Sequence, residues 1–294
     1  MMIASLGPCL PVDLLEATGR HAGQLAWQLG EETPRADRWL EDKFPPWSRS
    51  IVEQWATGRF DELDTVVFSR GDDAVQRVYY YVCELQRRGL VGGPRPIIFD
   101  VAQIPRETSE MHTIASVRRL AATLGLDNAA LEAAIGLTNA SRNPAGATRA
   151  DRPTCLIAGT PPPHRLLHDA IAACGYTAVG ETLAEAWSSP GPKVVEGSDD
   201  PAAMIGRQVH RRSNGRRAFA DLCETTLARA SESGAAAAVL WFSEQDEASV
   251  WQLPRVRDAL AAHGVPILVM TRRDETSCDG AAAEIQTFLK GLPS

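Results

Sequence analysis

Short β-rich apolar runs alternate with long helical patterns along this chain, and this alternation constrains the fold more than any other feature. Strands are expected over residues 25–29, 65–69, 97–101, 154–159, 177–180, 236–242 and 266–270. Helical periodicity marks residues 107–125, 128–138, 164–174, 202–231, 255–263 and 281–289. Parallel neighbouring strands need a long crossover, which is usually a helix. The sequence therefore predicts an α/β protein with mostly parallel sheets and flanking helices.

Two domains are expected from the chain length and from one interruption of this pattern. The chain has 294 residues, and a typical domain has about 150. Residues 139–153, NASRNPAGATRADRP, are polar and broken by Gly and Pro. We therefore expect an N-terminal α/β domain with extra helices over 1–145 and a C-terminal α/β domain over 150–294. A similar stretch, residues 188–201, is interpreted as a surface loop of the second domain.

Charge and hydropathy argue against several classes of partner. Thirty Lys and Arg stand against 37 Asp and Glu, for a net charge of −7, and no basic run occurs. No apolar run approaches the ~20 residues of a transmembrane helix, and the start of the chain lacks the basic and apolar regions of a secretory signal. We expect a cytoplasmic protein whose partners are neither nucleic acid nor membrane.

Two features are candidates for anion or CoA binding. Gly159 and Thr160 follow an expected strand and lead into an expected helix, where free N–H groups can receive a phosphate. Three prolines follow and remove donors, so a plain strand-to-helix turn is the alternative. Arg207 and Arg211 belong to a basic stripe with Arg212, Arg216 and Arg217. That stripe either holds a pyrophosphate or carboxylate or is solvated helix surface.

The sequence predicts no metal site. Six cysteines are scattered, with no CxxC pair and no His/Cys cluster at zinc-ligand spacing. His164 and His168 are spaced to share a helix face, as two metal ligands would, but no third ligand accompanies them. We interpret them as a polar helix face.

Four segments in succession resemble a known family. They are LPVDLLEATG at 10–19, KFPPWSRSIVEQWATGRFDELDTVVFSRGDDAVQRVYYY at 43–81, TCLIAGTPPPHRLLHDAIAACGYTAVGET at 154–182 and GAAAAVLWFSEQDEASVWQLPRVRDALAAHGVPILVMTRRDE at 234–275. In this order they are similar to segments of the D-component family of 2-hydroxyacyl-CoA dehydratases and benzoyl-CoA reductases. The resemblance implies two flavodoxin-like or Rossmann-like domains. It also implies a dimer of related subunits, an acyl-CoA substrate, and a four-iron four-sulfur cluster held by three cysteines and reduced by an ATP-driven activator.

This chain departs from the family at all three cluster-ligand positions, which are occupied by Pro45, Asp72 and Ser243. Soft thiolates suit an iron–sulfur core, whereas oxygen ligands are harder and proline offers none. We therefore expect no cluster and no other cofactor. Helix capping is the alternative explanation for the second and third positions: Asp72 or Asp73 can cap the following helix, and Ser243 has the capping-box spacing to Asp246.

Two functions stay open. The first is a cluster-free subunit that supports acyl-CoA binding or assembly with a cluster-bearing paralogue, as a heterodimer, although a homodimer is also open. The second is a stand-alone enzyme doing non-redox chemistry on an acyl thioester or related anion, with Asp72, Asp73 and Ser243 in an interdomain cleft. Any catalysis would be that of a lyase or a reductase subunit. Whether Cys9, Cys83 or Cys278 rebuilds a metal site is also open.

Overall fold

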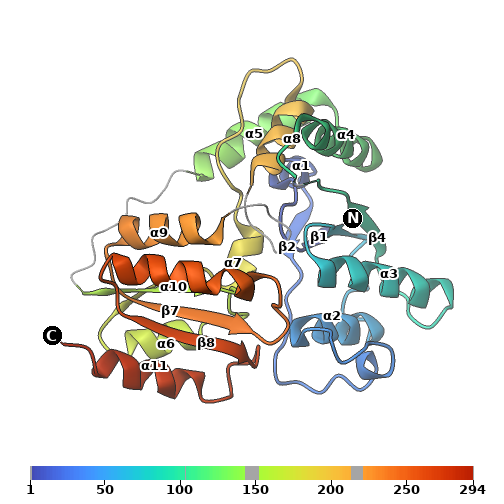
Figure 1. The fold of residues 1–294 in the computed structure, drawn as a ribbon. Coiled ribbons are helices and arrows are strands. Elements are labelled where there is room, and N and C mark those ends of the chain that lie inside the picture. The colour runs from blue at the N-terminus through green and yellow to red at the C-terminus, as the bar shows by residue number, and fades with distance from the viewer. Residues whose placement is uncertain (1, 103, 143–151, 213–220, 294) are drawn as a thin grey trace. The chain divides into compact units, whose positions relative to one another are not determined.

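The computed structural model describes residues 2–102, 104–142, 152–212 and 221–293. It divides into two compact units, Met1–Ala145 with Trp187–Phe219, and Gly146–Ala186 with Ala220–Ser294 (Figure 1). Each unit holds one four-stranded, all-parallel sheet flanked by helices. The predicted α/β architecture with parallel sheets is confirmed.

The first unit has the strand order β2-β1-β3-β4. Its strands are β1 (Ile3–Leu6), β2 (His21–Gln24), β3 (Thr65–Ser69) and β4 (Arg95–Phe99). Its helices are α1 (Val12–Ala17), η1 (Ala36–Arg38), α2 (Pro46–Ala56), α3 (Asp73–Arg87), α4 (Glu107–Leu124), α5 (Asn128–Ser141) and α8 (Pro201–Arg211), while α7 (Leu183–Ser188) crosses from the second unit into the first.

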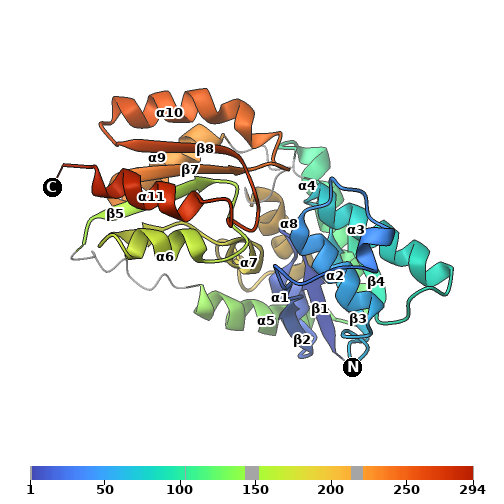
Figure 2. The same ribbon diagram turned by 90° about the horizontal axis from the view of Figure 1, so that it is seen from below.

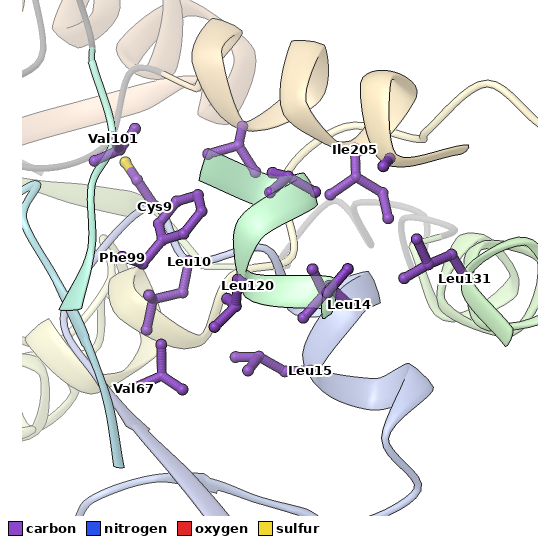
Figure 3. Packing of buried hydrophobic residues seen from close by; sticks show 14 of the residues in the cluster. Cys9, Leu10, Leu14, Leu15, Val67, Phe99, Val101, Leu120, Leu131 and Ile205 are labelled. Atoms are coloured by element: carbon purple, nitrogen blue, oxygen red, sulfur yellow. The ribbon is translucent and has the colours of Figure 1, made fainter. Parts of the chain in front are cut away.

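Apolar residues of α1, α4, α5 and α8 form one core with residues from the first sheet. Figure 3 shows Leu14 of α1, Leu120 of α4, Leu131 of α5 and Ile205 of α8 in this cluster. Val67 of β3 belongs to this core, whereas its neighbour Phe68 contacts Trp55 of α2 and Tyr79 of α3. Because successive strand residues point to opposite faces, both faces of this sheet are covered.

The second unit has the order β6-β5-β7-β8. Its strands are β5 (Thr154–Gly159), β6 (Thr177–Val179), β7 (Ala235–Ser243) and β8 (Ile267–Arg273). Its helices are α6 (Leu166–Ala172), α9 (Leu222–Ser233), η2 (Ser249–Gln252), α10 (Leu253–Ala262) and α11 (Ala281–Lys290). Figure 2 shows α6 and α11 on one side of this sheet and α10 on the other. Trp241 packs with residues of α6 and α11, and its neighbour Phe242 packs with residues of α9 and α10.

Three expectations about individual strands and helices differ from the structure. Residues 25–29 form no strand, and the neighbouring strand is instead β2. Strand β1 was not expected, because four residues that are buried on both faces show no alternation. The helix expected over 202–231 is two helices, α8 and α9, which belong to different units; residues 213–220 lie outside the described residues.

The segment from Trp187 groups with the first unit, not with a continuous second domain as expected. Helix α8 packs closely on α4, since a Cβ at Gly206 would stand 2.7 Å from the Ile114 Cα. Val194 of the preceding stretch is also part of the first core. The stretch 188–201 therefore belongs to the first unit.

A buried ion pair joins three segments of the first unit. Both carboxylate oxygens of Asp13 accept from Arg142, at 2.8 and 2.6 Å, and the two side chains are 1% and 2% exposed. Thr138 also donates to Asp13, and Arg142 donates to the Pro190 carbonyl at 3.0 Å. The linked segments are α1, the end of α5 and the stretch after α7.

Two more side chains hold the stretch after α7. Arg212 donates to the carbonyls of Leu10 and Ser189, and Gln208 donates to those of Pro190 and Pro192. Carbonyls of a loop without secondary structure are thereby satisfied by side chains. Among the described residues, no single helix is long and apolar enough to cross a membrane; α4 and α5 together meet the length and composition, but they are bent by 109° at their break.

Candidate functional site

Polar residues gather in both units where parallel strands end. In each sheet the second strand along the chain pairs on one side of the first strand, and the third strand pairs on its other side. The connections that leave β1 and β3, and those that leave β5 and β7, therefore run in opposite directions along the sheet. Ligands of such sheets bind at this switch point. Asp72 follows β3, while Gly159, Thr160 and Ser243 stand at the ends of β5 and β7. Their convergence with Pro45 in one cleft stays a prediction.

Asp72 has a structural role in the first unit. Its Oδ1 accepts from the Val75 N–H at 3.0 Å, which makes it the N-cap of α3, and it is buried. The expectation that Asp72 or Asp73 caps this helix is confirmed, for Asp72. Asp73 is exposed in the first helical turn.

Pro45 is the buried residue before α2, and a tryptophan cluster lies next to it. Trp47 packs on Trp27 and on Trp187, with ring centroids 6.1 and 5.0 Å apart, and the last two rings are 5.4 Å apart. The Pro45 carbonyl accepts from the Ser48 hydroxyl at 2.7 Å. Pro45 is therefore buried at the start of α2, and its carbonyl is used by the first turn of that helix.

Replacing Asp72 with alanine should lower the free energy of unfolding by about 1 kcal/mol, because the Val75 N–H loses its acceptor. Asp72→Asn keeps an acceptor and should lower the free energy of unfolding by only a few tenths of that ~1 kcal/mol. Denaturant titration of the full chain measures both. The matched control is Asp127→Ala, which removes the cap of α5 that accepts from Ala130 at 2.8 Å. A cost of Asp72→Ala far above that of the control would show a role beyond capping.

In the second unit the structure brings Thr160 and Ser243 together. The Thr160 hydroxyl donates to Asp246 Oδ2 at 2.6 Å and accepts from the Ser243 N–H at 3.2 Å. All three residues are buried. The Ser243 hydroxyl has no hydrogen-bond partner among the described residues.

The capping box expected at Ser243 is wrong. A turn follows β7, with the Asp246 N–H donating to the Ser243 carbonyl at 3.2 Å, and no helix begins there. Asp246 Oδ1 instead accepts from Ser249 at the start of η2, at 3.0 Å. The spacing was suitable, but the loop is longer than a capping box requires.

The loop after β5 offers little to a phosphate. The Thr160 N–H is used by the Trp241 carbonyl at 2.8 Å, and three prolines follow. Helix α6 begins only at Leu166 and has seven residues. The adjoining cavity, lined in part by Thr160, Thr225 and Arg229, has about 60 Å³. That volume suits a few water molecules and not a CoA phosphate.

The two histidines of this region are not a metal pair. His164 precedes α6, and its Nε2 lies 2.7 Å from the Thr276 carbonyl. His168 lies within α6, with its Nε2 3.0 Å from the Gly180 carbonyl. Within the described ranges no group of three His, Cys, Asp or Glu side chains could hold a metal ion.

The described part of the basic stripe is divided between the surface, where Arg207 and Arg211 are exposed on α8, and the core, where Arg212 is buried. Arg207 pairs with Glu110 at 3.3 Å, and Arg212 is buried against backbone carbonyls, while Arg211 is exposed. The helix ends at Arg211. Arg216 and Arg217 lie outside the described residues.

None of the six cysteines, all of which lie in the described ranges, is in a disulfide. Burial raises the pKa of Cys155 to about 12, and it also raises the pKa of Cys83. Such thiols stay protonated at neutral pH and are poor metal ligands. Cys9 is buried with a φ of 57°, and Cys278 is exposed.

One polar cluster was missed by the sequence analysis. Asp100 Oδ1 accepts from Arg70 at 2.9 Å, and Oδ2 lies 3.0 Å from His112 Nε2. Arg70 and Asp100 directly follow the paired residues Ser69 and Phe99 of β3 and β4, and this adjacency was the available signal. All three side chains are partly exposed, so the ion pairs contribute little to stability.

A second arrangement has the spacing of a catalytic triad without its accessibility. His21 Nε2 lies 3.0 Å from the Ser5 hydroxyl, and Nδ1 lies 2.7 Å from Glu16. Ser5 is only 1% exposed and its hydroxyl also contacts the Gly23 carbonyl at 3.3 Å. A nucleophile must reach its substrate, so these residues instead connect β1, β2 and α1.

No protein-family model matches the chain, and no curated protein matches it. The family resemblance of the four segments therefore stays a prediction.

Proposed function

We propose that this chain is a cluster-free subunit of a complex of the 2-hydroxyacyl-CoA dehydratase or benzoyl-CoA reductase type. It assembles with a related subunit that keeps its cysteines, and it supports acyl-CoA binding or assembly. The observation that carries this proposal is the structural role of the residues at the three cluster-ligand positions. Pro45 is buried before α2, Asp72 caps α3, and the Ser243 N–H is bound to Thr160.

The chemistry of these side chains supports the absence of a cluster. An iron–sulfur core needs thiolate ligands at fixed positions. At the three positions this chain offers one side chain that cannot ligate, one carboxylate used by a backbone N–H, and one hydroxyl. The parallel doubly wound units supply the framework that the family resemblance implies, without its redox ligands.

Iron and acid-labile sulfide analysis of anaerobically purified protein tests this proposal. We expect no stoichiometric iron, against about four irons per chain for a cluster-bearing subunit. The control is the cysteine-complete related subunit, purified in the same way. A brown preparation with about four irons and matching sulfide would overturn the proposal.

Assembly has its own test. Co-expression with the cysteine-complete subunit should give one complex in size-exclusion chromatography, and its turnover of acyl-CoA should fall when this chain is omitted. A chain that always elutes apart from that subunit would contradict the proposal.

The alternative is a stand-alone enzyme acting on an acyl thioester or related anion without redox chemistry. One observation favours it: the Ser243 hydroxyl is buried without a described partner, close to Thr160 and Asp246. Such a hydroxyl ordinarily binds a water, an ion or a ligand. Turnover of an acyl-CoA by the isolated chain, abolished by Ser243→Ala, would favour this alternative over the subunit.

A further inference from the structure

Helix α9 carries one polar side chain in its buried stripe. Cys223, Thr226 and Ala230 are the buried residues of this helix. Thr226 is 2% exposed, and its hydroxyl makes no hydrogen bond within the described residues. Its neighbour Thr225 makes the usual bond to the preceding turn, donating to the Asp221 carbonyl at 3.1 Å. Because buried hydroxyls ordinarily have a partner, the Thr226 hydroxyl indicates a ligand or a water beside it.

A small cavity adjoins Thr226. It has a volume of about 60 Å³, and its lining includes Thr226, Pro162, Glu181 and Arg229. Thr226 and Pro162 are buried, whereas the side chains of Glu181 and Arg229 are 41% and 52% exposed. Thr226 therefore lies at the inner end of the cavity, and the two charged residues lie at its opening. Since a water takes ~30 Å³ of liquid volume, the cavity has room for about two waters or for one group of similar size.

The opening of the cavity already holds a carboxylate. Arg229 Nη2 donates to Glu181 Oε2 at 2.9 Å, and this is the one hydrogen bond of the Arg229 guanidinium within the described residues. A guanidinium has five N–H donors and no acceptor, so donors stay available for a second carboxylate. The pair is exposed and therefore weak, so a ligand can also displace Glu181.

The loop that lines the cavity supplies no donor from its described residues 160–162. The Thr160 N–H and hydroxyl are already bonded, and Pro161 and Pro162 have no N–H. The available donors are on α9. Thr226 and Arg229 are three residues apart on this helix, so their side chains are neighbours, with Cβ atoms about 5–6 Å apart. Two donors at this separation suit the two oxygens of one carboxylate.

We propose that this cavity binds the carboxylate group of a small organic acid. One oxygen accepts from the Arg229 guanidinium and the other from the Thr226 hydroxyl, while the rest of the molecule extends through the opening. Glu181 competes for Arg229, so the affinity is low, with a dissociation constant on the order of 1 mM. The inference does not rest on the proposed function, because it needs neither CoA nor a second subunit.

Titration of the full chain with sodium acetate tests the inference. The ionic strength is kept constant with sodium chloride, and the backbone amide shifts along α9 are followed by NMR. The wild type should show a saturating shift centred on Thr226 and Arg229, with a millimolar dissociation constant.

Variants of the three side chains should change acetate binding in different directions. Arg229→Met should abolish it, and Thr226→Val, which removes little more than the hydroxyl, should weaken it about fivefold at an unchanged Tm. Thr226→Ser keeps the hydroxyl and should bind as the wild type does. Glu181→Gln removes the competing carboxylate and should tighten binding about threefold. The matched control is Arg165→Met, which breaks a surface pair with Glu185 of similar exposure and should leave acetate binding unchanged.

Several results would overturn the inference. A shift that never saturates, or that sodium chloride alone reproduces, excludes a carboxylate site. Unchanged binding by Thr226→Val places the acetate elsewhere on the chain. Saturable binding of methylammonium in place of acetate assigns the cavity to a cation held by Glu181. None of these results changes the expected iron content or assembly, so the proposed function is tested separately.

Discussion

Arg142→Met is expected to lower the free energy of unfolding of the first unit by about 3–5 kcal/mol, because it leaves the Asp13 carboxylate buried without its cation. Asp13 is fully buried, and both its oxygens accept from Arg142. The Pro190 carbonyl loses its guanidinium donor in the same step. Denaturant titration monitored by tryptophan fluorescence measures the loss.

Two further variants test whether the loss of stability comes from the unpaired buried carboxylate. Asp13→Leu combined with Arg142→Met should recover most of the stability, since an apolar pair can replace a buried ion pair at little cost. Arg118→Met removes a surface pair with Asp200 and should cost less than about 1 kcal/mol. A single Arg142→Met variant as stable as the Arg118→Met variant would contradict the role given to this ion pair.

The second large effect is expected for Gly159→Ala, which should prevent the second unit from folding correctly. Gly159 has a φ of 104°, and a Cβ there would stand 2.2 Å from the Trp241 carbonyl oxygen. The Cβ is fixed to the β5 backbone and the oxygen belongs to the backbone of the paired strand β7, so neither atom can rotate away. The Thr160 to Trp241 hydrogen bond would break first. Loss of near-UV circular dichroism of the chain, to which the buried Trp241 contributes, reports the effect.

Gly175→Ala is the matched control, because Gly175 has a φ of 83° but no atom within 4 Å of its Cβ position. It carries only the conformational strain of a left-handed residue, about 1–2 kcal/mol. If the two variants were equally stable, the close approach of β5 to β7 would not matter.

The sequence predicts most of the sheets for a clear physical reason. Strands β3 and β5 match their expected bounds, because each is a buried apolar run enclosed by turn residues. Both faces of a parallel sheet are covered, so such runs stand out. Strand β1 is shorter and lies near the start of the chain, where no preceding turn marks it.

Tertiary contacts decide what the sequence misses. The sequence pattern over 202–231 is helical throughout. Only tertiary packing places α8 against α4 in the first unit and α9 against the sheet of the second unit. At the site, strand ends predict the meeting of Thr160 with Ser243 but not of Asp100 with His112, which comes from inside α4. Asp13 and Arg142 are separated by 129 residues, and no local pattern reports their pairing.

The return of α8 to the first unit has a consequence for synthesis on the ribosome. The first core includes Ile205 and Val209, so it cannot close when residue 145 emerges. Translation must first produce residues 146–211, up to the end of α8, which takes roughly 3–13 s at about 5–20 residues per second. During this interval α1, α4 and α5 expose the apolar surface that α8 later covers. The nascent chain is then a substrate for chaperones for longer than a chain whose domains follow one another.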